Sequence, residues 1–181
     1  MSAETIAAIW RYPVKSMRGE ELSAAAINER GLPADRVMAL IDRETGKVAS
    51  AKHPRRWGRL LDCAAAVATI DDDGTVSIRV SLPDGRTLMS GDEAIDEALS
   101  ELFGRSVTLS YVPPHVAETE REYPVVQGLP VSGMFFSGQI GLGAPPATFF
   151  DYAPIHLLTT ATLAELRRVE PNSDCDCRRF R

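Results

Sequence analysis

The sequence VSIRVSL at residues 76–82 decides the fold class, because apolar and polar side chains alternate along it. A period of two is typical of a β-strand that buries one face. The turn sequences DDDG at 71–74 and PDG at 83–85 bound this strand on both sides. Further strand patterns are found at residues 6–12, 22–27, 37–41 and 107–111. Together they predict a protein built mainly from short strands.

Two helices are expected beside these strands. Ser90 and Glu93 have the spacing of a capping box before an apolar repeat, and Gly104 stands where a C-terminal cap belongs. A second helix is expected to begin near Thr159 and to end before Pro171. Its inward-facing residues are expected to be Leu163, Leu166 and Val169.

The overall composition is that of an ordinary globular protein. The chain has 181 residues, of which 44% are hydrophobic and 25% are charged. Six prolines between residues 113 and 146 predict long loops there. Because strands are many and helices few, the sequence predicts a β-rich α+β fold rather than a parallel α/β sheet.

Charge and targeting signals restrict the partners and the location that we expect. The net charge of 20 − 25 = −5 disfavours a broad nucleic-acid surface. The start of the chain lacks the features of a signal peptide, and the apolar stretch at 63–70 is far shorter than the about 20 residues that cross a bilayer. We therefore expect a cytoplasmic protein that binds neither nucleic acid nor a membrane.

The cysteines and histidines do not predict a metal site. Cys63, Cys175 and Cys177 are odd in number, so they do not form a disulfide framework, and free thiols suit the reducing cytoplasm. The CxC pair lacks the second pair that zinc or an iron–sulfur cluster needs. His156 lies in an apolar run and is expected to be a hydrogen-bonded core residue.

A group of basic and hydroxyl residues is the best candidate for a site. Lys15 and Ser16 follow Pro13, which ends the first strand, and Arg36 precedes the buried run at 37–41. An ammonium group, a hydroxyl and backbone N–H groups at a strand end suit a phosphate or another oxyanion. Spacing alone leaves open the alternative that each is a solvated charge.

An ordered series of motifs resembles the MOSC family, named for the C-terminal domain of molybdenum cofactor sulfurase. WRYPVKSM at 10–17, GL at 31–32, DR at 35–36, TGKV at 45–48 and SAKHPR at 50–55 resemble its N-terminal β-barrel lobe. Residues 149–170, with DYAP at 151–154, resemble the start of the MOSC domain proper, and FR at 180–181 resembles the first half of its FRPN motif. The family includes the mitochondrial amidoxime-reducing component and bacterial relatives.

The resemblance implies three parts along the chain. Residues 1–112 would form the β-barrel-like N-terminal lobe, residues 113–148 a loop-rich connection, and residues 149–181 the start of an incomplete MOSC domain. We expect the chain to be the N-terminal two-thirds of a longer protein, because relatives continue beyond the FRPN motif.

The resemblance also implies a cofactor, the molybdenum cofactor (molybdopterin), which carries a phosphate at one end. Lys15, Ser16 and Arg36 match the family's cofactor-binding positions, and Arg181 matches the arginine of FRPN. Pyridoxal phosphate is associated with the family through a separate sulfurase domain, which nothing in this chain resembles, so we do not expect it here.

The function implied by the resemblance is that of a reductase of N-hydroxylated or N-oxidised small molecules, supplied with electrons by a ferredoxin- or cytochrome-type partner. The cysteine that binds molybdenum in this family lies beyond residue 181, and neither Cys175 nor Cys177 matches it. We therefore assign no catalytic residue and no metal ligand. The alternative hypothesis is a non-catalytic β-barrel module that binds an anionic ligand or partner.

Overall fold

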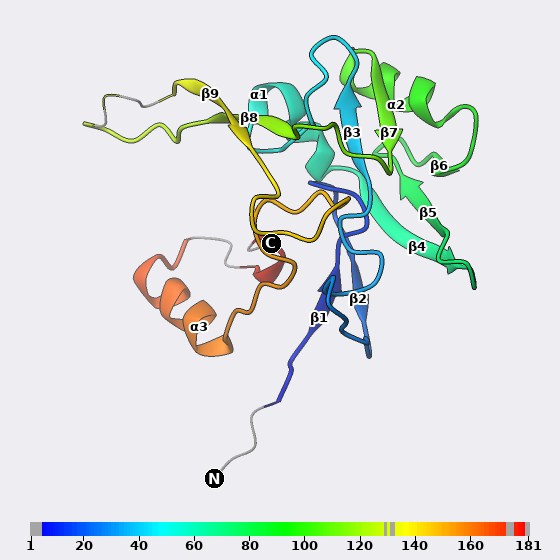
Figure 1. The fold of residues 1–181 in the computed structure, drawn as a ribbon. Helices are drawn as coiled ribbons and strands as arrows, with labels where there is room; N and C mark the ends of the chain where they lie inside the picture. The colour runs from blue at the N-terminus through cyan, green and yellow to red at the C-terminus, as the bar shows by residue number, and fades with distance from the viewer. Residues whose placement is uncertain (1–4, 129, 131–132, 173–175, 180–181) are drawn as a thin grey trace.

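The computed structural model describes residues 5–128, 130, 133–172 and 176–179 (Figure 1). Along the chain the strands are β1 (Ile9–Arg11), β2 (Glu20–Leu22), β3 (Ala39–Asp42), β4 (Ala64–Ile70), β5 (Val76–Ser81), β6 (Thr87–Met89), β7 (Val107–Ser110), β8 (Glu118–Glu122) and β9 (Phe135–Gln139). The helices are α1 (Pro54–Trp57), α2 (Ile95–Phe103) and α3 (Thr160–Val169), with short 3-10 helices at Gly58–Leu61 and Cys177–Arg179.

The strands form several small antiparallel sheets. β1 pairs with β2, β3 with β7, β8 with β9, and β5 lies between β4 and β6. Single parallel bridges, Val14 to Met38 and Arg18 to Ala64, join neighbouring sheets. The prediction of a β-rich α+β fold is thus confirmed, although the strands in the described part of the chain do not close into a barrel.

The main hydrophobic core lies between the β4–β5–β6 sheet, α2 and the segment that follows β1. Ile78 and Val80 of β5 are fully buried, while Arg79 between them is exposed, as the alternating pattern predicts. Leu99 of α2 and Met17 pack into the same cluster. Strand β4 was not predicted, because its sequence AAAVATI is rich in alanine and lacks a clear alternation.

The helix predicted after Ser90 is confirmed, but its start differs from the prediction. Gly104 caps α2 with a φ of 61°, a left-handed conformation that glycine adopts without a Cβ penalty. The Ser90 hydroxyl does not cap the helix; it accepts a hydrogen bond from the Ile78 N–H at 3.1 Å. The helix begins after Ala94 without a side-chain cap.

The second helix forms where it was expected, but its apolar face is not buried. The Thr159 hydroxyl accepts a hydrogen bond from the Thr162 N–H at 3.0 Å and so caps α3. Leu166 and Val169 are exposed, and α3 has no buried residue. The prediction that these side chains point inward is wrong, because α3 lies at the edge of the molecule (Figure 1).

Two loop and strand assignments were also wrong. Residues 23–27 are not a strand; β2 ends at Leu22. The proline-rich stretch after residue 113 contains the β8–β9 hairpin, which extends from the body of the protein (Figure 1). Its charged strand β8 is held by backbone bonds, from the Val48 N–H to the Glu118 carbonyl and from the Glu122 N–H to the Lys52 carbonyl, each 2.8 Å. Such tertiary bonds are not visible in a local sequence pattern.

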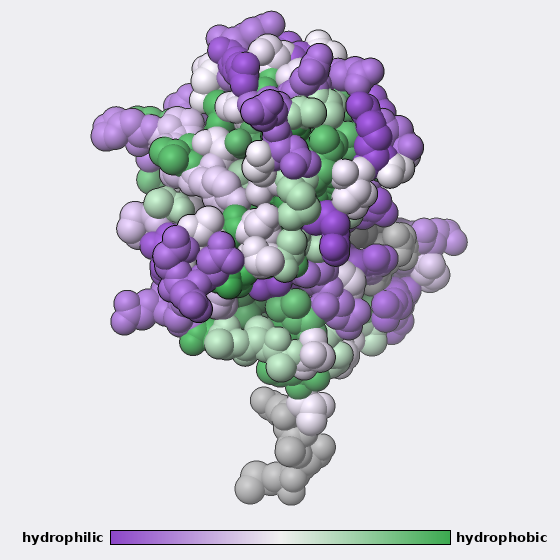
Figure 2. Space-filling view, turned by 90° about the vertical axis from the view of Figure 1, so that its right-hand side faces the viewer, coloured by the Kyte–Doolittle hydropathy of each residue, from purple (hydrophilic) through white to green (hydrophobic). Residues whose placement is uncertain are grey.

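Figure 2 shows one face of the molecule, on which hydrophilic residues dominate the top and the sides and hydrophobic residues gather along the lower part. A surface that mixes polar and apolar residues is usual for a globular domain.

Candidate anion-binding pocket

Backbone pairing brings Lys15 and Arg36 to the same place. The segment after β1 runs beside the start of β3, where the Met38 N–H donates to the Pro13 carbonyl at 3.1 Å and the Lys15 N–H donates to the Met38 carbonyl at 2.9 Å. At the same junction the Arg36 N–H donates to the Tyr12 carbonyl at 2.9 Å. Residues 21 positions apart in the sequence therefore flank one opening.

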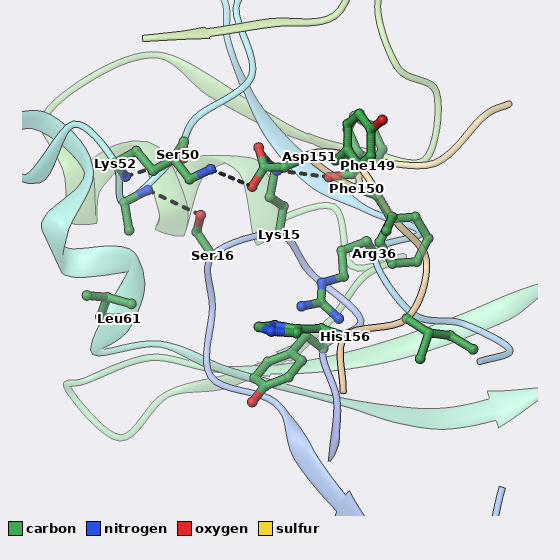
Figure 3. A pocket seen from close by; sticks show the side chains of 15 residues that line it. Lys15, Ser16, Arg36, Ser50, Lys52, Leu61, Phe149, Phe150, Asp151 and His156 are labelled. Carbon is green, nitrogen blue, oxygen red and sulfur yellow. Dashed lines mark hydrogen bonds and ion pairs between the residues drawn. The ribbon is translucent and has the colours of Figure 1, made fainter. Parts of the chain in front are cut away.

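Ser16 and Arg36 both adopt left-handed backbone conformations, with φ of 66° and 47°. Residues other than glycine seldom adopt this region, and such strain is concentrated at functional sites. The Ser16 hydroxyl accepts a hydrogen bond from the Ala51 N–H at 3.2 Å, which fixes its direction (Figure 3).

Lys15, Ser16 and Arg36 line one pocket of about 490 Å³. The remaining polar wall includes Lys52 and Asp151, and aromatic rings complete the lining: Tyr12, Phe149, Phe150, Tyr152 and His156. Three of the four residues that the sequence analysis selected as cofactor ligands are thus neighbours in space. The fourth, Arg181, lies outside the described residues.

Lys15 is almost completely buried and connects the segment after β1 to residues 149–151. Its Nζ donates to the Phe149 carbonyl at 2.9 Å and lies 3.1 Å from Asp151 Oδ1. Burial lowers the pKa of Lys15 to about 8, although the Asp151 carboxylate acts in the opposite direction. Below that pH the buried ammonium is charged and contributes positive potential to the pocket.

Asp151 is surrounded by cations. Lys52 Nζ donates to Oδ2 at 2.9 Å (Figure 3). Arg121 Nη2 lies 3.5 Å from Oδ1, the oxygen that also faces Lys15. Burial alone would raise the pKa of Asp151, but the charges of Lys15 and Lys52 lower it below its ordinary value. Asp151 is therefore ionised at neutral pH.

Arg36 presents its guanidinium differently from Lys15. Nη1 donates to Asp35 Oδ2 at 2.5 Å, and the guanidinium carbon lies 4.5 Å from the centre of the Tyr12 ring and 5.6 Å from that of Phe150. Within the described structure, its other N–H groups have no protein acceptor. An arginine that contacts two aromatic rings and still has free donors suits recognition of a phosphate.

Asp35 forms an ion pair with this arginine. Its carboxylate is buried and accepts a hydrogen bond from the Tyr12 N–H at 2.7 Å. Burial raises the pKa of Asp35, and the adjacent Arg36 charge offsets part of that effect. Arg36 thus has two tasks, to neutralise a buried carboxylate and to face the pocket.

The sequence analysis did not assign Lys52 and Asp151 to a site, and it placed His156 in the core rather than at the pocket. Lys52 and Asp151 occur in the quoted motifs SAKHPR and DYAP, but nothing in their spacing showed that they meet. His156 is exposed and lines the pocket, so the prediction that it lies in the core is wrong. The pairing partners that reveal these roles are about 100 residues away in the chain.

The thiols that the structure describes do not line this pocket. Cys63 is buried in the main core, and burial raises its pKa to about 11, which suppresses the thiolate form that binds metals. Cys177 is free and half-buried, and Cys175 lies outside the described residues. Among the residues that are described, no group of three or more His, Cys, Asp or Glu side chains is arranged to hold a metal ion.

The fold and this pocket define a β-rich protein with a cationic, aromatic-walled site between its N-terminal segment and residues 149–156. Residues 3–100, more than half of the chain, match the family described as the MOSC N-terminal beta barrel domain. The chain belongs to this family, as the resemblance predicted. Comparisons with curated proteins and with solved structures gave no match. None of the helices in the described part of the chain has both the length and the apolar character needed to cross a bilayer.

Proposed function

We propose that this protein binds the phosphate end of the molybdenum cofactor (molybdopterin) in the pocket formed by Lys15, Ser16 and Arg36. The observation that supports the proposal is the convergence of these residues, selected from the sequence, on one pocket with aromatic walls. A phosphate needs cations and hydrogen-bond donors at fixed positions, and a flat ring system is accommodated by aromatic side chains.

The residues present fit one end of this cofactor. The guanidinium of Arg36 has donors that Asp35 does not occupy, and the Lys15 ammonium adds a second positive charge. A volume of about 490 Å³ is within the range of small-molecule sites. The described residues that line the pocket include no thiol, so this chain's described part would hold the phosphate and the ring rather than the metal.

The bound cofactor would supply redox chemistry at its metal, and this chain's residues would anchor and orient it. We infer a role in the reduction of N-hydroxylated or N-oxidised small molecules, in the cytoplasm, with electrons from a ferredoxin- or cytochrome-type partner. The support for this role is membership of the MOSC family.

The test is the pterin content of the purified protein carrying this chain, measured by pterin fluorescence. Arg36→Lys keeps a cation beside the buried Asp35 but loses the planar set of donors, and should lower the pterin content by about tenfold, since a charge-assisted hydrogen bond contributes about 1.5–3 kcal/mol. Arg79→Lys, on an exposed position of β5, is the matched control. Equal pterin content in wild type and Arg36→Lys would refute the assignment.

The second candidate function is a non-catalytic module that binds another anion in the same pocket. It is favoured by the observation that the pocket is lined by several cations, while the described residues contain no group of three or more His, Cys, Asp or Glu side chains that could hold a metal ion. Purified protein that binds phosphate but never carries pterin would support this candidate over the first.

A further inference from the structure

We propose that the Asp151 carboxylate is an internal substitute for the ligand's phosphate: it occupies Lys15 and Lys52 in the ligand-free protein, and an incoming phosphate displaces it. This proposal rests on the proposed function, because it concerns the same pocket, and it names an opposing group within that pocket.

The first support is the geometry around the carboxylate. Asp151 receives Lys52 Nζ on one oxygen at 2.9 Å, while the other faces Lys15 Nζ at 3.1 Å and Arg121 Nη2 at 3.5 Å. A carboxylate bound to several cationic donors uses the same recognition chemistry as a phosphate. The cation group already holds an anion of the kind that it is proposed to bind.

The second support is the charge balance. Lys15, Lys52 and Arg121 provide three positive charges, and Asp151 provides one negative charge, so the group keeps a net charge of about +2 when Lys15 is protonated. A phosphate monoester carries close to two negative charges at neutral pH. It therefore matches these cations better than a single carboxylate does.

The third support is that the side chain can leave without moving its backbone. The Asp151 carbonyl accepts a hydrogen bond from the Gly141 N–H at 3.0 Å, and Phe149, two residues earlier, is fully buried, which fixes the main chain. By contrast, 32% of the Asp151 side chain and 46% of the Lys52 side chain are exposed. In addition, the buried oxygen Oδ1 has no hydrogen bond of good geometry, so its contacts are ionic and less restrictive.

The consequence is that Asp151 competes with any incoming anion for Lys15 and Lys52. A weak or singly charged anion must displace Asp151 and gains little, whereas a phosphate replaces one negative charge by about two. Asp151 therefore weakens the binding of every anion by a similar factor, so an anion must bind the cations strongly, as phosphate does, to displace it, and after displacement its carboxylate turns toward solvent.

The experiment is a calorimetric titration of the full chain with inorganic phosphate. Asp151→Asn removes the charge but keeps the size and an acceptor oxygen, and should bind phosphate about tenfold more tightly than wild type, as expected for relief of one opposing charge-assisted contact. Acetate, which must displace the same carboxylate, should gain by a similar factor. The control is Glu101→Gln on α2, which removes an exposed carboxylate that pairs with Arg86. It should not change the affinity for phosphate or for acetate.

A crystal structure of wild-type protein with phosphate tests the displacement without any variant. The expected result is phosphate on Lys15 and Lys52, with Asp151 out of contact with both. Phosphate bound with Asp151 still in place, or equal affinities of wild type and Asp151→Asn, would refute the displacement while leaving the proposed function intact. Absence of phosphate binding in both proteins would also refute it, and the pterin content of the protein then decides the proposed function separately.

Discussion

Lys15 should make the protein more stable as the pH rises above 8, relative to a variant without this amine. The buried ammonium has a pKa lowered from 10.5 to about 8, so between these values the unfolded chain holds a proton that the folded chain has released. In that interval the folded state gains about 1.4 kcal/mol per pH unit, which integrates to about 3 kcal/mol. The free energy of unfolding of wild type minus that of Lys15→Met should therefore increase between pH 8 and pH 10.5.

The measurement is urea-induced unfolding of both proteins at pH 7, 8, 9 and 10. Below pH 8 the difference between them should be constant, since Lys15 is protonated in both states. Lys52→Met is the matched control, because Lys52 binds the same carboxylate but 46% of its side chain is exposed; its difference from wild type should change less with pH. A difference for Lys15→Met that stays flat or decreases up to pH 10 would contradict the burial argument.

Three further predictions concern the framework around the pocket. Gly19→Ala should lower the free energy of unfolding by about 2 kcal/mol, because a Cβ there would lie 2.1 Å from the Arg11 carbonyl oxygen. The control Gly91→Ala has open space around the new Cβ and should change this free energy by less than about 0.5 kcal/mol. Urea unfolding measures both. Thr159→Ala removes the cap of α3 and should destabilise this helix by about 1 kcal/mol. Because α3 buries no residue, the effect should appear as faster hydrogen exchange in α3 alone. Slower or unchanged exchange would contradict the role of Thr159 as a cap. Burial and the nearby Arg56 lower the pKa of His53, so wild type should lose stability relative to His53→Gln as the pH falls below 6.5. A constant difference in the free energy of unfolding between pH 7 and pH 5 would show that the ring is not buried in its neutral form.

The parts of the fold that could be predicted from sequence are those set by local patterns. The alternation in β5 and the glycine cap of α2 each reflect a side-chain preference acting over a few residues. Strand β4 and the β8–β9 hairpin could not be predicted in this way, because their sequences have weak or contrary preferences. Strands β4 and β8 are each a hairpin partner of the next strand, and backbone contacts with distant segments add to this local pairing: Ala64 of β4 bridges to Arg18, and β8 bonds to Val48 and Lys52.

The same division applies to the candidate site. Lys15, Ser16 and Arg36 were found because a strand end and a motif series marked them, and the structure places them around one pocket. Asp151 could not be found from spacing, since its contact with Lys15 joins residues 136 positions apart. The structure also changes what a substitution at Arg36 means, because removing its charge would leave the buried Asp35 carboxylate without its cation. For this reason Arg36→Lys, rather than an alanine substitution, separates binding from stability.

The most direct test of the central claim compares the binding of a pterin that carries a terminal phosphate with the binding of the same pterin after its phosphate has been removed. Equilibrium titration of the 181-residue chain should give at least about tenfold tighter binding of the phosphorylated form, and Arg36→Lys should abolish most of that difference. Equal affinity for the two forms, or a preference that Arg36→Lys leaves unchanged, would contradict the claim that this pocket recognises the phosphate of the cofactor.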